Sequence, residues 1–394
     1  MLVEIPIDIW DPSRGGLEGY LWRLARFLTA RGHRVRILCR RSSGPSGLGS
    51  EEPIEVEELS VPRWPRWWRE IRFARAALAH RRAGGADVTL AVRHTLEADA
   101  YQPHGGPFRT ALAASLEGIE PAALRFLKRA LRRLRPTNRV LLYLDREIFR
   151  RSEGLITLSL SGKVEEDFRR AYPGENFRFE RLGSGVDLEE FHDRDRAERS
   201  RELRERFALP PEARSALFIG HKFGPKGLGE AVRALAAAPL WHLVVVGRGR
   251  PRRYRRLSRK LGVEGRVHFA GPTGDPRGFL AAADALVLPT RHDPCSLVVL
   301  EALACGTPAV TTTANGAGEL MEPGREGFVV EPGDIGAVAS ALEAIRRDWD
   351  RFHAAALETS RRLSLDAHFA AMERVLDRAA RERRARRGTR AQNG

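Results

Sequence analysis

The sequence predicts an α/β protein with two successive doubly wound halves, each built on a parallel β-sheet. At 394 residues, the chain has the length of about two to three typical domains. Short apolar runs alternate with amphipathic stretches along most of the chain, which is typical of strand–helix–strand units in a parallel sheet. A second series of these units begins after residues 183–187 (GSGVD).

The first strand–helix–strand unit opens the chain. Residues 1–9 (MLVEIPIDI) have the pattern of a buried strand, and the loop after them contains Gly15 and Gly16. Gly32 ends the helix that follows, and residues 35–38 (VRIL) form the next predicted strand. The apolar residues of that helix recur at helical spacing: Leu17, Tyr20, Leu21, Leu24, Ala25 and Leu28.

The remaining predicted elements follow the same logic. Residues 41–52 read as a loop, and further strands are expected at 87–92, 154–158, 215–220, 243–247, 267–270, 285–288 and 308–312. Helices are expected at 228–238 and 296–304, and the boundary between the halves near 185–212. Residues 373–394 are rich in arginine and poor in apolar residues, so the last stretch is expected to fray.

Composition excludes several classes of protein. No apolar run reaches the roughly 18 residues of a membrane span, and the first ten residues lack a signal peptide's basic region. Three cysteines without a CxxC pair favour a reducing cytoplasm, and no paired His/Cys spacing indicates a metal site. With 67 Lys+Arg against 51 Asp+Glu, the net charge is +16. A basic chain favours anionic partners: nucleic acid, phosphorylated substrates or an acidic membrane face.

Two segments of the first half are basic and also carry apolar anchors. Residues 61–83 hold Trp64, Trp67 and Trp68 among seven arginines. Residues 121–136 place Leu124, Leu127, Leu131 and Leu134 on one helical face, with Arg125, Lys128, Arg129, Arg132, Arg133 and Arg135 on the rest. Such segments suit an anionic bilayer surface. The alternative is that the leucines belong to the core and the arginines form a solvated face.

Ligands of open α/β sheets bind beyond the carboxyl ends of the strands, so the loops there are the candidate sites. Gly15 and Gly16 could present backbone N–H groups to an anion at a helix start, or form a simple tight turn. Lys226, in the loop 221–227 (HKFGPKG), could offset the charge of a phosphate-bearing leaving group, or be solvated. In the loop 247–250 (GRGR), Gly247 permits close backbone approach and Arg248 can pair with phosphate.

The segment 286–310 (LVLPTRHDPCSLVVLEALACGTPAV) is the most informative. Asp293 lies in the predicted loop and Glu301 about two turns into the helix, and carboxylates accept hydrogen bonds from the vicinal hydroxyls of sugars. The alternative for Glu301 is a structural hydrogen bond to a neighbouring loop. An anion or hydroxyl oxygen could be received by free backbone N–H groups near Cys295, Ser296 and Leu297.

These motifs together resemble the retaining GT-B glycosyltransferases of family four, over roughly residues 1–370. The resemblance rests on Gly15–Gly16, 31–35 (RGHRV), 184–192 (SGVDLEEFH), 218–227 (FIGHKFGPKG), 244–249 (VVVGRG) and the acidic-x7-Glu signature from Asp293 to Glu301. Residues 249–269 and, more loosely, 98–106 (ADAYQPHGG) resemble the lipopolysaccharide core glucosyltransferases that act on heptose.

The resemblance implies two Rossmann-like domains facing a cleft. Residues 1–185 would bind the acceptor, residues 186–365 the sugar nucleotide, and residues 366–394 would form a helix returning to the first domain plus a basic tail. The implied reaction is retaining, metal-independent transfer of a hexose from a nucleotide sugar such as UDP-glucose to a lipopolysaccharide core or related envelope glycan. No cofactor is implied beyond this co-substrate, and the expected location is the cytoplasmic face of the cell membrane.

The resemblance also implies roles for individual residues. Lys226 would neutralise the donor diphosphate, and Asp293 with the backbone N–H groups after it would hold the donor sugar. Glu301 would bind the ribose hydroxyls, and Gly16 would approach the phosphates. His104 falls near the family's histidine beside the transferred sugar.

The chain departs from the family at three of these positions. His221 stands where the family usually has an arginine, and Pro225 stands where heptose-specific relatives place one. Lys222 and Arg248 are therefore the alternatives for the second cation at the diphosphate. Asp293 replaces the usual glutamate of the signature.

Three other functions are compatible with parts of the sequence. One is transfer to another acceptor: a capsule, an exopolysaccharide or a small molecule. The second is a sugar-nucleotide epimerase on the same fold. The third, from a different class, is a nucleic-acid-binding protein, which only the net charge supports, because no recognised nucleic-acid-binding motif is present.

Overall fold

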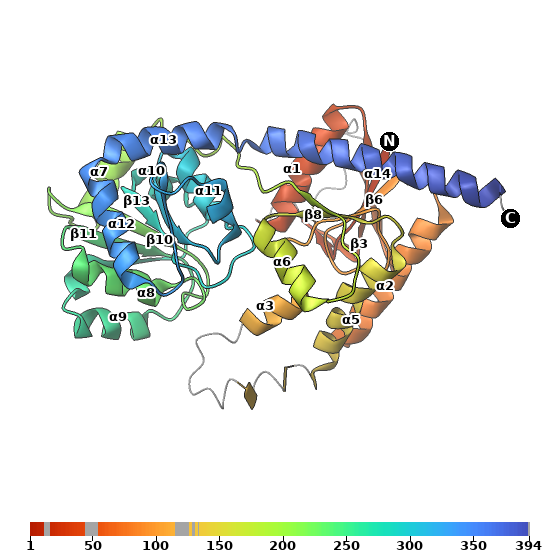
Figure 1. Ribbon diagram of the computed structural model, residues 1–394, viewed down its shortest axis with the longest axis horizontal. Coiled ribbons are helices and arrows are strands. Elements are labelled where there is room, and N and C mark those ends of the chain that lie inside the picture. The colour runs from red at the N-terminus through yellow and green to blue at the C-terminus, as the bar shows by residue number, and fades with distance from the viewer. Residues whose placement is uncertain (12–15, 44–53, 115–125, 128–130, 133, 393–394) are drawn as a thin grey trace. The chain divides into compact units, whose positions relative to one another are not determined.

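The computed structural model describes residues 1–11, 16–43, 54–114, 126–127, 131–132 and 134–392. The chain divides into two compact units, each a parallel sheet with helices packed around it (Figure 1). The first unit comprises Met1–Leu182 and Phe369–Gly394, and the second comprises Gly183–His368. These divisions lie within three residues of the boundaries expected from the sequence, at 185 and 365.

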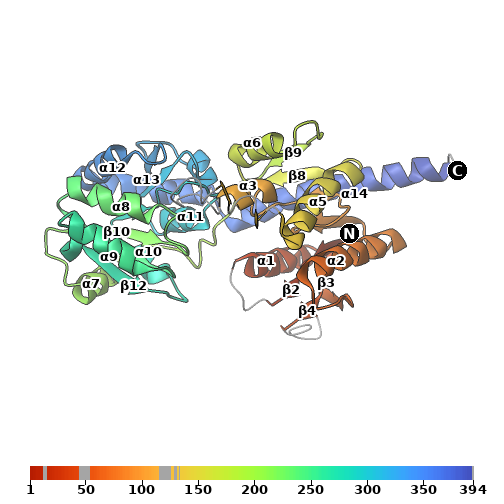
Figure 2. The ribbon, with the colours of Figure 1, turned by 90° about the horizontal axis from the view of Figure 1, so that it is seen from below.

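The first unit contains a sheet of seven strands in which every described pair is parallel. In spatial order the strands are β5 (Ile54–Glu58), β3 (Arg34–Cys39), β1 (Leu2–Pro6), β6 (Val88–Ala91), β7 (Ala100–Tyr101), β8 (Ile156–Ser159) and β9 (Phe179–Arg181). All five residues of β1 are buried, as a central strand covered on both faces requires. The described helices that precede β9 in this unit, seen from below in Figure 2, are α1 (Leu17–Ala30), α2 (Arg66–Ala83), α3 (Phe108–Ala114), α5 (Pro136–Arg151) and α6 (Gly162–Ala171).

The second unit contains a six-stranded sheet, again with only parallel pairs among its described strands. In spatial order these are β12 (Val267–Gly271), β11 (Trp241–Val246), β10 (Arg214–Ile219), β13 (Ala285–Val287), β14 (Ala309–Thr312) and β15 (Gly327–Val330). Its helices are α7 (Arg196–Arg206), α8 (Leu228–Ala234), α9 (Pro251–Lys260), α10 (Arg277–Ala282), α11 (Leu297–Ala304), α12 (Ile335–Arg347) and α13 (Trp349–Arg361). The predicted helix 228–238 is α8 followed by a 3-10 turn at Leu235–Ala237.

Five of the described strands were not predicted from the sequence. Three of them, β5, β9 and β15, lie at sheet edges, and the other two, β4 (Arg41–Ser42) and β7, have only two residues each. An edge strand buries less apolar surface than a central one, so its sequence carries a weaker pattern. The predicted first strand is two strands, β1 and β2 (Ile9–Trp10), because β2 leaves the main sheet to pair with β4 (Arg41–Ser42). The expected loop 41–52 therefore begins with a short strand.

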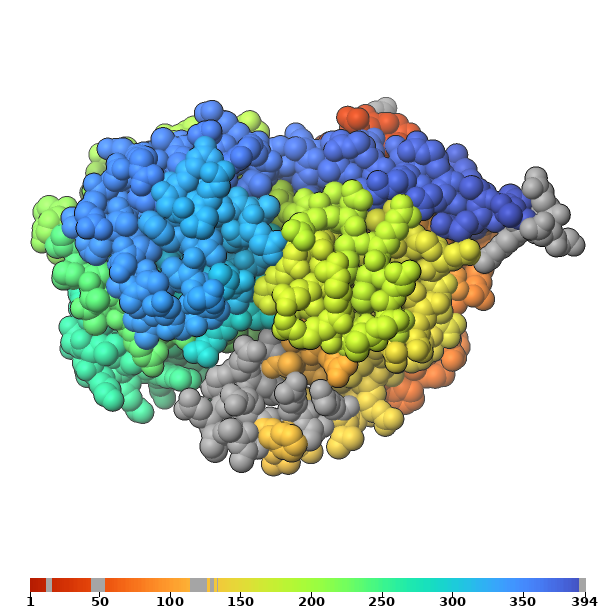
Figure 3. Space-filling model, in the orientation of Figure 1, coloured from red at the N-terminus to blue at the C-terminus, as the bar shows by residue number. Residues whose placement is uncertain are grey.

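The carboxyl-terminal helix that the family resemblance implied is present, but it continues to Gln392, where the arginine-rich composition predicted fraying. Helix α14 runs from Leu365 to Gln392, and from Phe369 onward it belongs to the first unit. It buries a row of apolar side chains: Phe369, Met372, Val375, Leu376, Ala379 and Ala380. Its arginines find carboxylates on that unit, as in the pair Arg378–Glu180 at 2.6 Å. Figure 3 shows the dark blue α14 lying directly along the yellow-green segment that includes β9. Charged residues thus anchor this helix.

Candidate active site

An ion pair between Lys226 and Asp293 is the centre of the candidate site on the second unit. Lys226 lies in the loop between β10 and α8, and Asp293 lies in the loop between β13 and α11. Strands β10 and β13 are parallel neighbours, so their carboxyl ends bring both loops to the same edge of the sheet. The Asp293 side chain is buried and the Lys226 side chain is partly exposed.

The loop of Lys226 is fixed against the loop of Asp293 by close backbone packing. Gly227 has φ +83°, and a Cβ there would lie 2.0 Å from the Pro289 carbonyl oxygen. Only glycine fits this approach. The Arg291 N–H donates to the Pro225 carbonyl oxygen at 3.0 Å, and the Thr290 hydroxyl donates to the same oxygen at 3.1 Å. Lys226 is therefore presented on a constrained turn.

A third loop, between β14 and the 3-10 helix Gly316–Leu320, fixes Asp293 from the other side. The Asp293 N–H donates to the Ala314 carbonyl oxygen at 3.0 Å, and the Gly316 N–H donates to the Asp293 carbonyl oxygen at 2.9 Å. Asn315 is 1% exposed. Its side-chain oxygen accepts from the Ser296 N–H at 3.1 Å. The Ser296 N–H is thus already paired, and the prediction that it is free for an anion is wrong.

Sequence reasoning missed Asn315. Its amide nitrogen donates to the Thr311 hydroxyl at 2.9 Å, and its oxygen also accepts from the Ala317 N–H at 3.2 Å. One buried amide therefore joins the end of β14 to the start of α11. The available signal was a polar residue directly after a buried strand, at 311–315 (TTTAN).

The predicted glycine–arginine loop meets the lysine loop at the same edge. Gly247 has φ +132°, and a Cβ there would lie 2.0 Å from the Gly220 carbonyl oxygen. The Arg248 N–H donates to His221 Nδ1 at 3.3 Å, and the Lys222 N–H donates to the Arg248 carbonyl oxygen at 3.0 Å. The side chains of Lys222 and Arg248 are exposed and lack an ion-pair partner among the described residues. Both are available for an anionic ligand.

Helix α11 carries the remaining donor-site candidates. Leu297 is its first residue and is 39% exposed, and Glu301 lies one turn later on the same side of the helix. Cys295, just before the helix, is buried. Burial and the nearby Asp293 carboxylate raise the pKa of Cys295 to about 12. Cys295 is therefore a neutral thiol at physiological pH, suited to packing rather than to nucleophilic attack.

Two of the predicted residues lie on the first unit. Gly16 precedes α1 with φ +77°, a conformation that favours glycine. Tyr20, one turn into α1, makes an edge-to-face contact with the His104 ring at 5.0 Å between centroids. Gln102 donates from its side-chain amide to the Tyr20 hydroxyl at 3.0 Å. The start of α1 and the loop after β7 are thus joined through Tyr20. Gly15 lies outside the described residues.

A buried carboxylate on the first unit was also missed. Asp145, on α5, is 0% exposed and accepts from the Phe108 N–H at 2.8 Å and from the Tyr172 hydroxyl. His94, in the loop after β6, has its Nε2 at 3.7 Å from the same carboxylate. Burial raises the pKa of Asp145 and lowers the pKa of His94. No sequence pattern indicated this cluster, because its four members come from four separate segments.

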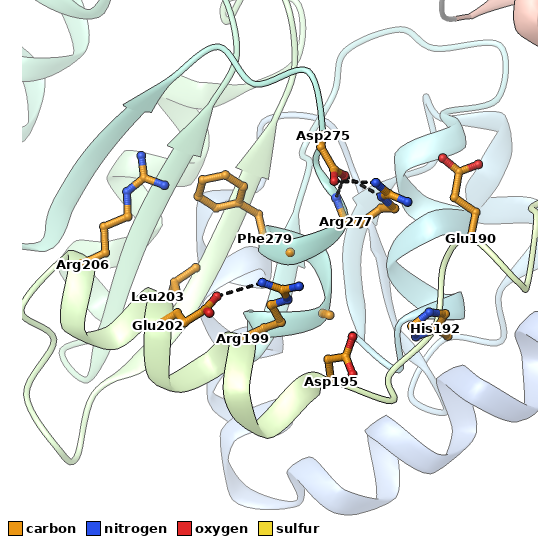
Figure 4. A pocket seen from close by; sticks show the side chains of 12 residues that line it. Glu190, His192, Asp195, Arg199, Glu202, Leu203, Arg206, Asp275, Arg277 and Phe279 are labelled. Atoms are coloured by element: carbon orange, nitrogen blue, oxygen red, sulfur yellow. Dashed lines mark hydrogen bonds and ion pairs between the residues drawn. The ribbon is translucent and has the colours of Figure 1, made fainter.

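The second unit also has a cavity of about 430 Å³ that none of the predicted residues line. Helices α7 and α10 form much of its wall, with Leu203 and Phe279 as apolar floor (Figure 4). Its charged side chains partly neutralise one another, as in the ion pairs Arg277–Asp275 at 2.7 Å and Arg199–Glu202 at 3.1 Å. This cavity does not contain Lys226 or Asp293. Over the described residues, no group of three or more His, Cys, Asp or Glu side chains is arranged to hold a metal ion.

Two Rossmann-like units with parallel sheets are the architecture of the GT-B glycosyltransferases. Among solved structures, the chain is similar to WaaG, a glycosyltransferase involved in lipopolysaccharide biosynthesis, with a TM-score of 0.70 and 23% identity over 95% of this chain and 99% of that chain. It is also similar to Anabaena Alr3699/HepE in complex with UDP-glucose, with a TM-score of 0.66 and 18% identity over 96% and 99%. The predicted fold class is confirmed.

Sequence comparisons give the family. Residues 14–190 match the model for Glycosyltransferase Family 4, and residues 214–348 match that for Glycosyl transferases group 1. The lipopolysaccharide glucosyltransferase WaaG of Escherichia coli (strain K12) is 28% identical over 80% of this chain and 82% of that protein. A D-inositol 3-phosphate glycosyltransferase of Xylanimonas cellulosilytica is 28% identical over 94% of both. The chain belongs to the GT-B glycosyltransferases of family four.

Proposed function

We propose that the chain transfers a hexose from UDP-glucose to a lipopolysaccharide core or related envelope glycan, with retention of configuration and without a metal ion. The observation that most strongly supports this proposal is the Lys226–Asp293 ion pair at the carboxyl ends of β10 and β13. It places a cation and a carboxylate together where open α/β sheets bind their ligands. The similarity to a lipopolysaccharide glucosyltransferase and to a UDP-glucose complex supports the donor and the acceptor.

The donor chemistry follows from charge. The leaving diphosphate gains negative charge as the glycosidic bond breaks, and Lys226 is the cation that offsets this charge. Lys222 or Arg248 supplies a second cation, because both side chains are exposed at the same edge. When the diphosphate engages Lys226, the Asp293 carboxylate becomes free to accept hydrogen bonds from sugar hydroxyls. Glu301 accepts from the ribose hydroxyls.

The acceptor chemistry belongs to the first unit. His104 is held by the ring of Tyr20, and we assign it to the transferred sugar and the attacking hydroxyl. Gly16, on the same unit, belongs to the donor side of the proposal: it precedes a helix start, where backbone N–H groups and the helix dipole favour the donor phosphates.

An inositol phosphate is the second candidate acceptor. Its support is the D-inositol 3-phosphate glycosyltransferase that matches over 94% of both chains. The deciding experiment offers UDP-glucose with a heptose-containing core oligosaccharide or with inositol 3-phosphate, and follows the product by NMR. An α-linked glucoside on the core oligosaccharide supports the first proposal. Transfer to inositol phosphate alone overturns the envelope acceptor but preserves sugar transfer.

We also propose that the enzyme binds the anionic cytoplasmic face of the cell membrane. Trp64 is 83% exposed, and Trp67 and Trp68 at the start of α2 are 37% and 36% exposed, among the arginines of 63–72. Interfacial tryptophans and nearby arginines favour an anionic bilayer. No described helix is long and apolar enough to cross a membrane.

The second basic segment, 121–136, lies largely outside the described residues. Within the part that is described, Leu127, Leu131 and Leu134 are each more than half exposed. The alternative prediction, that these leucines belong to the core, is therefore wrong for these three. Exposed leucines between arginines support the membrane proposal.

A further inference from the structure

The first unit contains a cavity of about 490 Å³ whose wall is dominated by arginine. The arginines come from three helices: Arg81 and Arg82 from α2, Arg151 from α5, and Arg383, Arg386 and Arg387 from α14. The acidic side chains in the wall are Glu97 and Glu153. A volume of several hundred Å³ is typical of small-molecule sites.

The cavity lies at the amino ends of the strands. Helix α2 ends at Ala83, before β6 begins at Val88, and the turn at 152–154 comes before β8 begins at Ile156. Glu97 likewise precedes β7. Ligands of the family fold bind at the carboxyl ends, which lie at the opposite edge of the sheet. The arginine cavity is thus distinct from the proposed acceptor site on the same unit.

Positive charge exceeds the carboxylates that could neutralise it. Asp99, buried beneath the cavity, is shared by Arg81 at 2.8 Å, Arg383 at 3.0 Å and Arg386 at 3.9 Å. Glu382 is shared between Arg386 at 3.7 Å and Arg178 at 2.7 Å. Arg387 has no carboxylate partner among the described residues. Arg383 is 5% exposed, so part of this excess charge is buried.

The backbone is shaped to admit one of these guanidinium groups. Gly154 follows α5 with φ +70°, and a Cβ there would lie 2.3 Å from Arg386 Nη1. Any larger residue would displace Arg386 from the cavity wall. Burial lowers the pKa of Arg383, and repulsion from Arg81 and Arg387 lowers it further. A bound anion would relieve this repulsion.

We propose that this arginine cavity binds a small ligand carrying two or three phosphate groups, at a site separate from the donor site. Guanidinium groups suit phosphate because their donors form bidentate hydrogen bonds. Arg82 pairs with Glu97 and Arg151 with Glu147, each at 2.6 Å. The surplus of positive charge therefore comes from Arg387 and from the arginines that share Asp99 and Glu382, and this surplus favours a ligand with more than one negative charge. The exposed tryptophans of α2 lie at the other end of this helix, about 20 Å along the helix axis from Arg81.

The test is calorimetric titration with inorganic pyrophosphate at fixed ionic strength. Because pyrophosphate could also occupy the donor site, the titration uses the Lys226→Ala background. Arg386→Gln with Arg387→Gln should weaken binding at least about tenfold, since two charged hydrogen-bond donors are lost. The matched control is Arg75→Gln, an exposed arginine of α2 away from the cavity, which should change affinity less than about twofold.

A second experiment distinguishes a free phosphorylated ligand from a lipid headgroup. It measures binding of the same variants to phosphatidylcholine vesicles with and without phosphatidylglycerol. Loss of pyrophosphate binding in the double variant with unchanged vesicle binding supports a free phosphorylated ligand. Loss of both supports a lipid headgroup in the same cavity. Equal pyrophosphate affinity in the double variant and in Arg75→Gln overturns the site, as does the absence of saturable pyrophosphate binding to a folded protein.

Discussion

Lys226 and Asp293, which are 67 positions apart in the sequence, form an ion pair at the carboxyl edge of the second sheet. Backbone contacts fix the position of each residue. The loop of Lys226 packs through Gly227 against Pro289, and the loop of Asp293 is hydrogen-bonded to the loop around Asn315. In the proposed reaction, the donor diphosphate replaces Asp293 as the partner of Lys226. Lys226→Ala should therefore affect the chemical step more than it affects donor affinity.

The role of Lys226 is tested by measuring both kcat and the donor Kd of the Lys226→Ala variant. Because charge on the leaving group grows in the transition state, Lys226→Ala should lower kcat by about a hundredfold or more and raise the donor Kd by less than tenfold. The control is Lys260→Ala, an exposed lysine at the end of α9. A wild-type kcat in Lys226→Ala would remove Lys226 from the mechanism.

Glu301 is expected to determine donor affinity. A carboxylate that accepts two ribose hydroxyls contributes about 1.5–3 kcal/mol, so Glu301→Ala should weaken UDP binding roughly tenfold or more. Calorimetry on the folded variant measures this directly, with Glu264→Ala as an exposed control. An unchanged affinity in Glu301→Ala would leave Glu301 with only a structural role.

Asp99 is expected to hold α14 in place. Burial alone would raise the pKa of Asp99, but its hydrogen bonds and ion pairs with Arg81 and Arg383 lower the pKa below its ordinary value. Asp99→Asn leaves the buried Arg383 without its anion and should reduce the free energy of unfolding by about 3–5 kcal/mol. Urea unfolding tests this, with the exposed Asp366→Asn of the same helix as control. A loss no larger than that of Asp366→Asn would contradict the anchoring role.

Acid sensitivity should arise from His242 on β11. Burial, together with the stacked ring of His268 at 3.1 Å (Nδ1 to Nε2), lowers the pKa of His242 to about 4. The unfolded chain protonates His242 near its ordinary value of 6.5. Stability should thus fall as the pH drops from about 6.5 to about 4. Comparing urea midpoints against pH for the wild type and His242→Gln isolates this step. If the urea midpoints of the two proteins fall equally as the pH drops, His242 is not the source of the acid sensitivity.

Membrane binding should depend on both basic segments. Each arginine near an anionic leaflet contributes about 1 kcal/mol, and salt should weaken binding because the Debye length falls to about 3 Å at 1 M. Vesicle co-sedimentation should decrease when Trp64, Trp67 and Trp68 are replaced by serine, or when Arg125, Arg129, Arg132 and Arg133 are neutralised. Hydrolysis of the donor in solution should be unchanged. Equal binding to neutral and anionic vesicles, or loss of donor binding in the neutralised variant, would contradict the proposal.

The sequence predicted central strands and loops better than edges and long-range partners. β1, β10 and β11 are buried and nearly continuous apolar runs, so periodicity identified them. The family resemblance implied a carboxyl-terminal helix, whereas composition alone suggested that its last stretch frays, because its arginines resemble a solvated tail. The distant carboxylate partners of these arginines make them structural.

In the candidate site, too, residues that a local pattern marks were predicted, and residues that depend on distant partners were missed. Lys226 and Asp293 lie in the loops that follow β10 and β13, and Glu301 lies on α11, the helix after the second loop, so the topology placed all three. Asn315 and Asp145 were missed because their importance comes from partners that no local pattern reveals.

Sugar transfer by this chain is tested most directly by measuring acceptor-dependent UDP release from UDP-glucose in the presence of EDTA. With a heptose-containing core oligosaccharide, the wild type should release UDP in step with formation of an α-linked glucoside, and Lys226→Ala should be about a hundredfold slower. No acceptor-dependent release, a β-linked product, or activity that EDTA abolishes and magnesium restores would contradict retaining, metal-independent glucosyl transfer.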